Sequence, residues 1–149
     1  MLSPARDVET VVRTTVATSS VRAPITMRLP FTPASVSVAR QQLKTWMGEN
    51  GGNGEAIEDA RVIVSELVAN SIRHASPLSD GQIHVSWVLE PRGIDLSVTD
   101  GGSSTRPRKV NAPSSALAGR GMAIVEMLAQ EWWSERTGSR TTVHALLHI

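Results

Sequence analysis

The sequence predicts an α+β domain, a two-layer α/β sandwich in which helices cover one face of a mixed, mostly antiparallel sheet. Three observations lead to this fold class. Several short segments alternate apolar and polar residues as strands do, two of these segments are separated by only a short turn, and the helical patterns are grouped together. Strands that can pair as hairpins, with helices kept apart from them, favour a sheet packed against a helical layer.

The first predicted elements are a strand and two helices. Residues 26–31 form the strand, after which the side-chain oxygen of Thr32 can cap a helix whose first position is Pro33. The glycine-rich segment 51–54 ends that helix. Apolar residues at helical spacing then predict a second helix from about residue 55 to residue 75.

The next predicted elements are a hairpin and a long loop. Residues 83–89 and 94–98 alternate apolar and polar side chains on either side of a turn at residues 91–93. Residues 101–118 show no period and are rich in Gly, Ser, Pro and Arg. We therefore expect a loop of the kind that covers a ligand, a lid.

The chain after the lid completes the sheet. Gly119 is predicted to open a third helix that ends near Gln130. A strand at residues 132–136, a turn at Gly138 and a last strand up to Ile149 follow.

Length and composition exclude several classes of protein. The chain has 149 residues, which suits one domain: we expect residues 1–23 to form an N-terminal arm and residues 24–149 to form the folded domain. It has no cysteine, which excludes disulfides and thiolate metal sites and agrees with a cytoplasmic location. The formal charge of +1 gives no reason to expect direct nucleic-acid binding. No apolar stretch reaches the roughly 18 residues of a membrane span, so no membrane contact is expected.

Polar side chains line one face of the second predicted helix. Glu66 and Asn70 are four residues apart and lie one above the other, and Arg73 and His74 extend the same stripe. Asparagine is unfavourable inside a helix because its amide competes with the backbone. A carboxylate and an amide oxygen at this spacing can position Mg²⁺ and an attacking hydroxyl; the simpler interpretation is a solvent-exposed helix edge.

Asp100 closes the second strand of the predicted hairpin. It follows Ile94, Leu96 and Val98 at even spacing, so its side chain should face the core. A buried carboxylate needs a partner, which the amino group of a ligand would provide, and the glycines up to Gly102 would let a flat ring approach the backbone. The alternative is an ordinary turn, in which Asp before Gly is common.

The segment Gly119-Arg120-Gly121-Met122 is the third candidate site. If two glycines open a helix, its backbone N–H groups and dipole can face phosphate oxygens, and the arginine can reach the same charges. The alternative is a flexible junction that happens to precede a helix.

The three motifs together, in this order, resemble the N, G1 and G2 boxes of GHKL (histidine kinase/Hsp90-like) ATPases. Within that group, residues 63–75 (IVSELVANSIRHA) and 119–125 (GRGMAIV) are similar to segments of the anti-sigma-factor serine/threonine kinases, a bacterial regulatory family. The resemblance covers about residues 26–149. It implies the Bergerat ATP-binding fold, with ATP and Mg²⁺ as ligands.

The resemblance also implies a role for individual residues. Asn70 would coordinate the Mg²⁺ that bridges the phosphates, and Glu66 would accept the proton of a serine hydroxyl on a protein substrate. Asp100 would bind the adenine amino group. The other nucleotide-binding residues that it implies are His74, Gly102, Gly119, Arg120, Gly121, Met122 and Thr142.

The function that follows by resemblance is an anti-sigma factor that also acts as a kinase. Such a protein holds a sigma factor and phosphorylates an anti-anti-sigma antagonist with Mg-ATP, and its relatives commonly form homodimers. The alternative is an ATP-binding interaction module without kinase turnover. The catalytic domain of a sensor histidine kinase and a structural domain without ligand agree less well with the sequence.

Overall fold

The computed structural model describes residues 23–103 and 116–148, of which residues 116–120 are described by their backbone alone. Residues 1–22 of the predicted arm (1–23) and residues 104–115 of the predicted lid (101–118) lie outside the described residues. The elements follow in the order β1 (Ile25–Pro30), α2 (Ala34–Glu49), α3 (Gly54–His74), β2 (Gln82–Glu90), β3 (Gly93–Asp100), α4 (Ala116–Leu128), β4 (Glu131–Thr137) and β5 (Arg140–Leu147).

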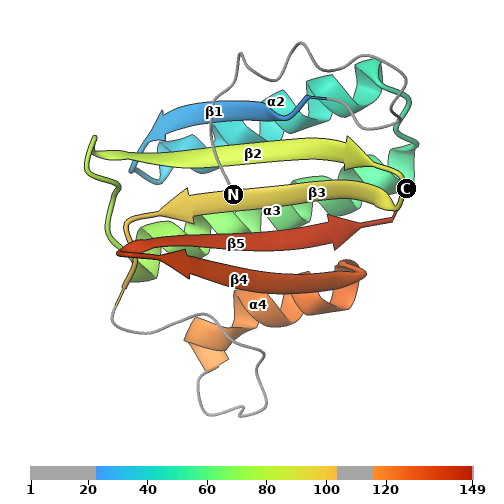
Figure 1. Cartoon of the computed structure of the whole chain (residues 1–149). Coiled ribbons are helices and arrows are strands. Elements are labelled where there is room, and N and C mark those ends of the chain that lie inside the picture. Colours follow the sequence, from blue (N-terminus) through green and yellow to red (C-terminus); the bar gives the residue numbers. More distant parts are fainter. Residues whose placement is uncertain (1–22, 104–115, 149) are drawn as a thin grey trace.

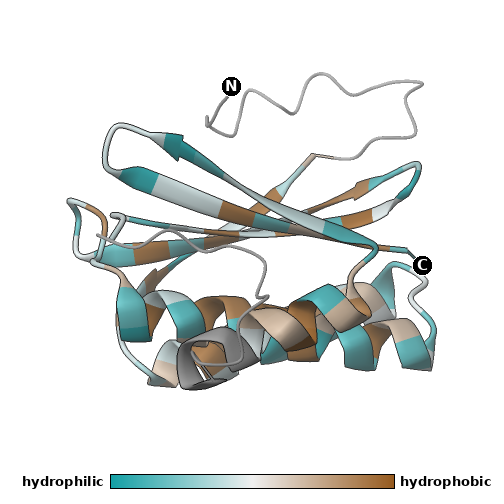
Figure 2. Cartoon of the chain, turned by 90° about the horizontal axis from the view of Figure 1, so that it is seen from below, coloured by the Kyte–Doolittle hydropathy of each residue, from teal (hydrophilic) through white to brown (hydrophobic). Residues whose placement is uncertain are grey.

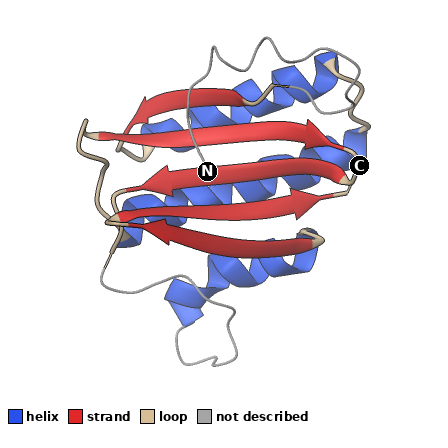
Figure 3. Ribbon diagram, in the orientation of Figure 1, coloured by secondary structure: helices blue, strands red, loops and turns tan. Residues whose placement is uncertain are grey.

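The five strands form one sheet in the order β1-β2-β3-β5-β4. All four neighbouring pairs are antiparallel. The described sheet is therefore wholly antiparallel, whereas a mixed sheet was predicted. The three helices lie on one face of this sheet, which we call the inner face (Figures 1 and 3). Seen from the edge, the sheet and the helices form two layers (Figure 2). The predicted α+β sandwich is confirmed.

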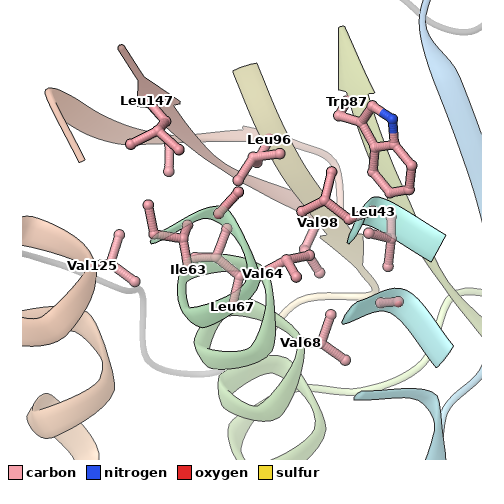
Figure 4. Close-up of a cluster of buried hydrophobic side chains, with 14 of the residues drawn as sticks. Leu43, Ile63, Val64, Leu67, Val68, Trp87, Leu96, Val98, Val125 and Leu147 are labelled. Atoms are coloured by element: carbon pink, nitrogen blue, oxygen red, sulfur yellow. The ribbon is translucent and has the colours of Figure 1, made fainter. Parts of the chain in front are cut away.

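The core lies between the two layers (Figure 4). Helix α3 contributes six buried residues to it, spaced three and four apart along one face, and strands β2, β3 and β5 contribute alternate positions, as the period of two requires. The central buried side chains are Leu43, Ile63, Val64, Leu67, Val68, Trp87, Leu96, Val98, Val125 and Leu147. Burial of this apolar stripe fixes the rotation of α3 beneath β3, and with it the direction in which the polar residues of α3 point.

The start of the first helix differs from the prediction. Pro33 is the cap residue of α2, and no side chain caps it. Thr32 contributes its backbone carbonyl instead, which accepts from the N–H of Ser35 at 3.0 Å, while the Ser35 hydroxyl donates to the carbonyl of Pro30 at 2.6 Å. Helix α3 has the side-chain cap that α2 lacks, because Asn53 Oδ1 accepts from the N–H of Ala56 at 2.8 Å.

The start of the third helix also differs. Helix α4 begins at Ala116, so the prediction that Gly119 opens it is wrong. Residues 116–118 are Ala-Leu-Ala, which favour helix strongly, and they extend the helix before the glycines are reached. Gly119 and Gly121 therefore lie within the first two turns. The free backbone N–H groups of a helix belong to its very start, ahead of Gly121.

No helix among the described residues has the length and apolar character needed to cross a membrane.

Candidate nucleotide site

Three elements of secondary structure begin or end on the same side of the molecule. Strand β3 ends there at Asp100, α3 ends there at His74, and α4, which runs opposite to α3, begins there (Figure 1). Each of the three motifs singled out in the sequence lies on one of these ends. The fold therefore gathers at one place residues that are up to about fifty positions apart in the chain.

The carboxylate of Asp100 faces the helices from the end of β3. It is 4% exposed, as the alternation with Ile94, Leu96 and Val98 predicts. Its Oδ2 accepts from the hydroxyl of Ser71 on α3 at 2.6 Å, and its Oδ1 accepts from the N–H of Gly102 at 2.7 Å. Two short hydrogen bonds therefore hold the carboxylate in one orientation.

The environment of Asp100 disfavours its charge. Burial raises the pKa of this carboxyl above its ordinary value, while the hydrogen bonds from Ser71 and Gly102 and the charge of Arg136 oppose the rise. Arg136 acts from a distance, since its guanidinium donates to the carbonyl of Ser103 at 3.2 Å. Both direct partners of Asp100 are thus neutral donors, and a buried carboxylate of this kind favours a further donor from a ligand.

The backbone after Asp100 is held tightly. The N–H of Gly101 donates to the carbonyl of Ser76 at 2.8 Å, and the N–H of Ser76 donates to the carbonyl of Gly102 at 3.0 Å. Gly102 has φ of +92°, and a β-carbon there would overlap the carbonyl oxygen of Ser139. Only glycine suits this position, and the reason visible in the structure is this close packing and the N–H that Gly102 points at Asp100.

Glu66 lies where α3 and α4 approach each other. Gly121 of α4 is buried, and a β-carbon on it would lie 2.7 Å from Glu66 Oε1. The glycine therefore gives the carboxylate room between two helices. Position 121 thus acts through the absence of a side chain, rather than through a free helix-opening N–H group.

Asn70 is partly buried one turn after Glu66, and Arg73 and His74 are exposed at the end of the same helix. One turn of helix rises about 5.4 Å, so the amide and the carboxylate lie close together along one side of α3. Among the described residues no group of three or more His, Cys, Asp or Glu side chains could hold a metal ion. A Mg²⁺ held by one protein ligand and by substrate phosphates agrees with this arrangement, because Mg²⁺ is usually bound in that way.

Two residues predicted to contact nucleotide lie elsewhere. Met122 is 3% exposed and packs in the hydrophobic core. Thr142 points to the outer face of the sheet, where its hydroxyl is 2.8 Å from that of Thr99. The residue paired with Asp100 across the strands is Thr141, which is 7% exposed and shares the inner face with it. Thr141 therefore replaces Thr142 as the threonine beside Asp100.

Sequence reasoning missed three residues of this site, Ser71, Thr141 and Arg136. One of them left a signal: Ser71 falls on the buried stripe of α3 with Leu67 and Val68, and a polar residue on an apolar stripe needs a partner. Gly119 and Arg120 are described by their backbone alone.

The site fits an adenine nucleotide. A buried, oriented acceptor at Asp100 suits an exocyclic amino group, and Asn70, on the stripe that also carries Glu66, directly precedes the Ser71 that donates to Asp100. Such a combination of a perturbed buried carboxylate with convergent polar groups is typical of ligand sites.

Comparison with known proteins agrees with this geometry. The family model of the histidine kinase-like ATPase domain matches residues 29–146. The chain is 31% identical to the serine-protein kinase RsbW of Listeria monocytogenes serotype 4a over 119 residues, covering 72% of this chain and 76% of the relative. It is 29% identical to the serine-protein kinase RsbW of Oceanobacillus iheyensis, again over 119 residues, covering 72% and 75% of the two chains.

Two solved structures are similar in fold to this chain. The structure of the RsbU and RsbW domains of Rv1364c from Mycobacterium tuberculosis matches with a TM-score of 0.65 and 25% identity, over 85% of this chain and 32% of that longer chain. The SiaB–SiaC complex from Pseudomonas aeruginosa contains a chain with the same fold, at a TM-score of 0.65 and 11% identity, over 83% of this chain and 88% of that one.

The fold and the buried carboxylate beside a polar helix stripe define an ATP-binding domain of the histidine kinase-like class. The chain belongs to this family and, within it, to the serine-protein kinases of the RsbW type. The resemblance predicted from three short motifs is confirmed, and with it the class of ATP-binding serine kinase.

Proposed function

We propose that this chain is an anti-sigma factor that uses Mg-ATP to phosphorylate a serine or threonine of an anti-anti-sigma protein. The observation that carries the proposal is the buried carboxylate of Asp100 at the edge where the Glu66 and Asn70 stripe ends; within the part of the chain that the structure describes, its hydrogen-bond donors are all neutral. Its family membership adds the reaction class.

In this proposal the nucleotide spans the edge of the sheet. Asp100 accepts from the adenine amino group, with Thr141 beside it and Gly102 shaping the backbone. Asn70 is the protein ligand of Mg²⁺. The phosphates lie toward the start of α4, where the helix dipole favours anions; the candidate residues on that side are His74, Gly119 and Arg120.

Glu66 is the proposed general base. It accepts the proton of the substrate hydroxyl as the bond from that oxygen to the γ-phosphorus forms and the bond from phosphorus to the leaving ADP oxygen breaks. Its position supports this role, because the absence of a side chain at Gly121 lets the carboxylate lie between α3 and α4, one helical turn from Asn70. A module that only bound ATP would need no carboxylate at this position.

The proposed partners follow from the kinase class. They are a sigma factor, which the protein holds, and the anti-anti-sigma protein, which it phosphorylates; a homodimer in the cytoplasm is the proposed working form. We propose no contact with nucleic acid or membrane. The ATP-binding domain extends over residues 24–149, with residues 1–23 as an arm.

The test is phosphoryl transfer by wild type and Glu66→Gln from γ-labelled Mg-ATP to candidate anti-anti-sigma proteins of the source organism. We expect Glu66→Gln to bind ATP as wild type does and to transfer phosphate at least about 100-fold more slowly, since loss of a general base has an effect of that size. Glu58→Gln is the matched control, because Glu58 lies on the same helix but is exposed and paired with Arg61.

Transfer by Glu66→Gln at the wild-type rate would remove Glu66 from the reaction. If wild type binds ATP, retains a partner only in its presence and transfers no phosphate to any candidate, the interaction module is the correct function.

A further inference from the structure

The hydrogen bond between Ser71 and Asp100 joins the helix that carries the proposed magnesium ligand to the proposed adenine acceptor at the end of β3. Ser71 follows Asn70 directly on α3, so its side chain is rotated by about 100° from the proposed magnesium ligand. This rotation turns the hydroxyl toward β3. The Oγ to Oδ2 distance is 2.6 Å, and the two residues are 5% and 4% exposed.

Among the described residues, two donors contact the Asp100 carboxylate and leave some of its acceptor sites unoccupied. A carboxylate has about four lone-pair sites on its two oxygens. Ser71 occupies one site on Oδ2, and the N–H of Gly102 occupies one on Oδ1. With one donor on each oxygen the carboxylate cannot rotate freely, and its remaining sites can accept from a ligand.

Ser71 also supports the charge of Asp100. A hydroxyl that donates to a buried carboxylate over a short distance makes a charge-assisted hydrogen bond, which is stronger than a neutral one. Burial raises the pKa of Asp100, and of the groups that oppose this rise the Ser71 hydroxyl acts most strongly, ahead of Gly102 and Arg136. A cation in direct contact would support the charge more, but it would also occupy the acceptor sites.

We propose that Ser71 is a positioning residue for adenine recognition, whose hydroxyl holds the Asp100 carboxylate in the orientation that accepts the amino group of the base. This inference rests on the proposed function and extends it to a residue that does not touch the nucleotide. If Ser71 only held α3 against β3, its loss would instead affect the binding of both nucleotides equally.

The experiment compares two nucleotides that differ in one group. Mg-ATP and the Mg complex of purine riboside triphosphate, which has hydrogen in place of the adenine amino group, are titrated calorimetrically into wild type and Ser71→Ala. We expect Ser71→Ala to bind ATP roughly 5- to 20-fold more weakly, less than the full effect of a lost hydrogen bond to a charged group, because the lost bond only orients the acceptor. We expect the affinity for the analogue to differ less than about twofold between wild type and Ser71→Ala, because the analogue has no amino group for Asp100 to bind in either protein.

Thr99→Val is the matched control. It removes a hydroxyl from the neighbouring residue of the same strand, which bonds Thr142 on the outer face. We expect it to leave both affinities unchanged. A second readout is the acid limit of ATP binding: loss of the Ser71 hydroxyl should shift it to higher pH, because the carboxylate then takes up its proton more readily.

Equal weakening of both nucleotides by Ser71→Ala, or no weakening of either, would overturn the inference and leave the proposed function intact. Absence of ATP binding by wild type would overturn the proposed function itself. Should Ser71→Ala fail to fold, Ser71→Cys replaces the hydroxyl by a weaker donor of similar size, and the same loss restricted to ATP is expected.

Discussion

Two aspartates on strand β3 lie five residues apart and therefore point to opposite faces of the sheet. On the inner face, Asp100 accepts from a hydroxyl and a backbone N–H. On the outer face, Asp95 contacts Nδ1 of His144 at 3.1 Å. The outer carboxylate thus has a histidine with a raised pKa as its partner, whereas the inner one contacts only neutral donors among the described residues. This difference marks the inner aspartate as the one prepared for a ligand.

On the outer face, the side chains of Asp95, His144, Glu135 and Trp133 contact one another and form a cluster without a ligand. The second ring nitrogen of His144 lies 3.2 Å from Glu135 Oε1, and its ring stacks on Trp133 with centroids 4.8 Å apart. A neutral imidazole can donate from one nitrogen only, so two carboxylate partners favour the imidazolium. Burial opposes this charge, but Asp95 and Glu135 outweigh it and raise the pKa of His144.

The largest predicted effect concerns the packing around the inner aspartate. Gly102→Ala should lower the free energy of unfolding by on the order of 3 kcal/mol, because φ is +92° and the new β-carbon meets the carbonyl of Ser139. Gly138→Ala is the comparison: φ is +62° but nothing lies within 4 Å, so about 1 kcal/mol is expected. Urea denaturation measures both, and equal losses would show that the Ser139 contact does not matter.

A smaller effect is expected on the outer face. Because the pKa of His144 is raised in the folded protein, its ion pairs contribute stability that is fully present below the unfolded pKa of about 6.5 and is lost as pH rises through the folded value. His144→Gln should remove this pH dependence and lower stability in acid by on the order of 0.5 kcal/mol. Thermal unfolding of both proteins from pH 5 to pH 9 tests this; parallel curves would contradict it.

The comparison also shows what the sequence could predict. Strand alternation predicted the burial of Asp100, because the face on which a strand residue lies follows from its spacing to nearby residues of the same strand. Its bond to Ser71 joins residues 29 positions apart and depends on how α3 is rotated under the sheet. The resemblance implies Thr142, whereas Thr141 lies beside Asp100: a shift of one residue in a run of two threonines reverses the face, and sequence does not fix the register of such a run.

The start of α4 was missed for a different reason. Paired glycines predict a helix boundary, whereas in the structure the helix-favouring Ala-Leu-Ala segment precedes them. The close approach of Gly121 to Glu66 explains a glycine inside the helix, and such a contact between helices cannot be seen in a local pattern.

The most direct test of the nucleotide site is to titrate Mg-ATP calorimetrically into wild type, Asp100→Asn and Asp95→Asn. The two substitutions are the same chemical change on the two faces of one strand. We predict that Asp100→Asn weakens binding roughly 10- to 100-fold, because a charged acceptor for the adenine amino group is lost, and that Asp95→Asn binds as wild type does. Equal affinities for Asp100→Asn and wild type, or an equal loss in both variants, would contradict the placement of adenine at Asp100.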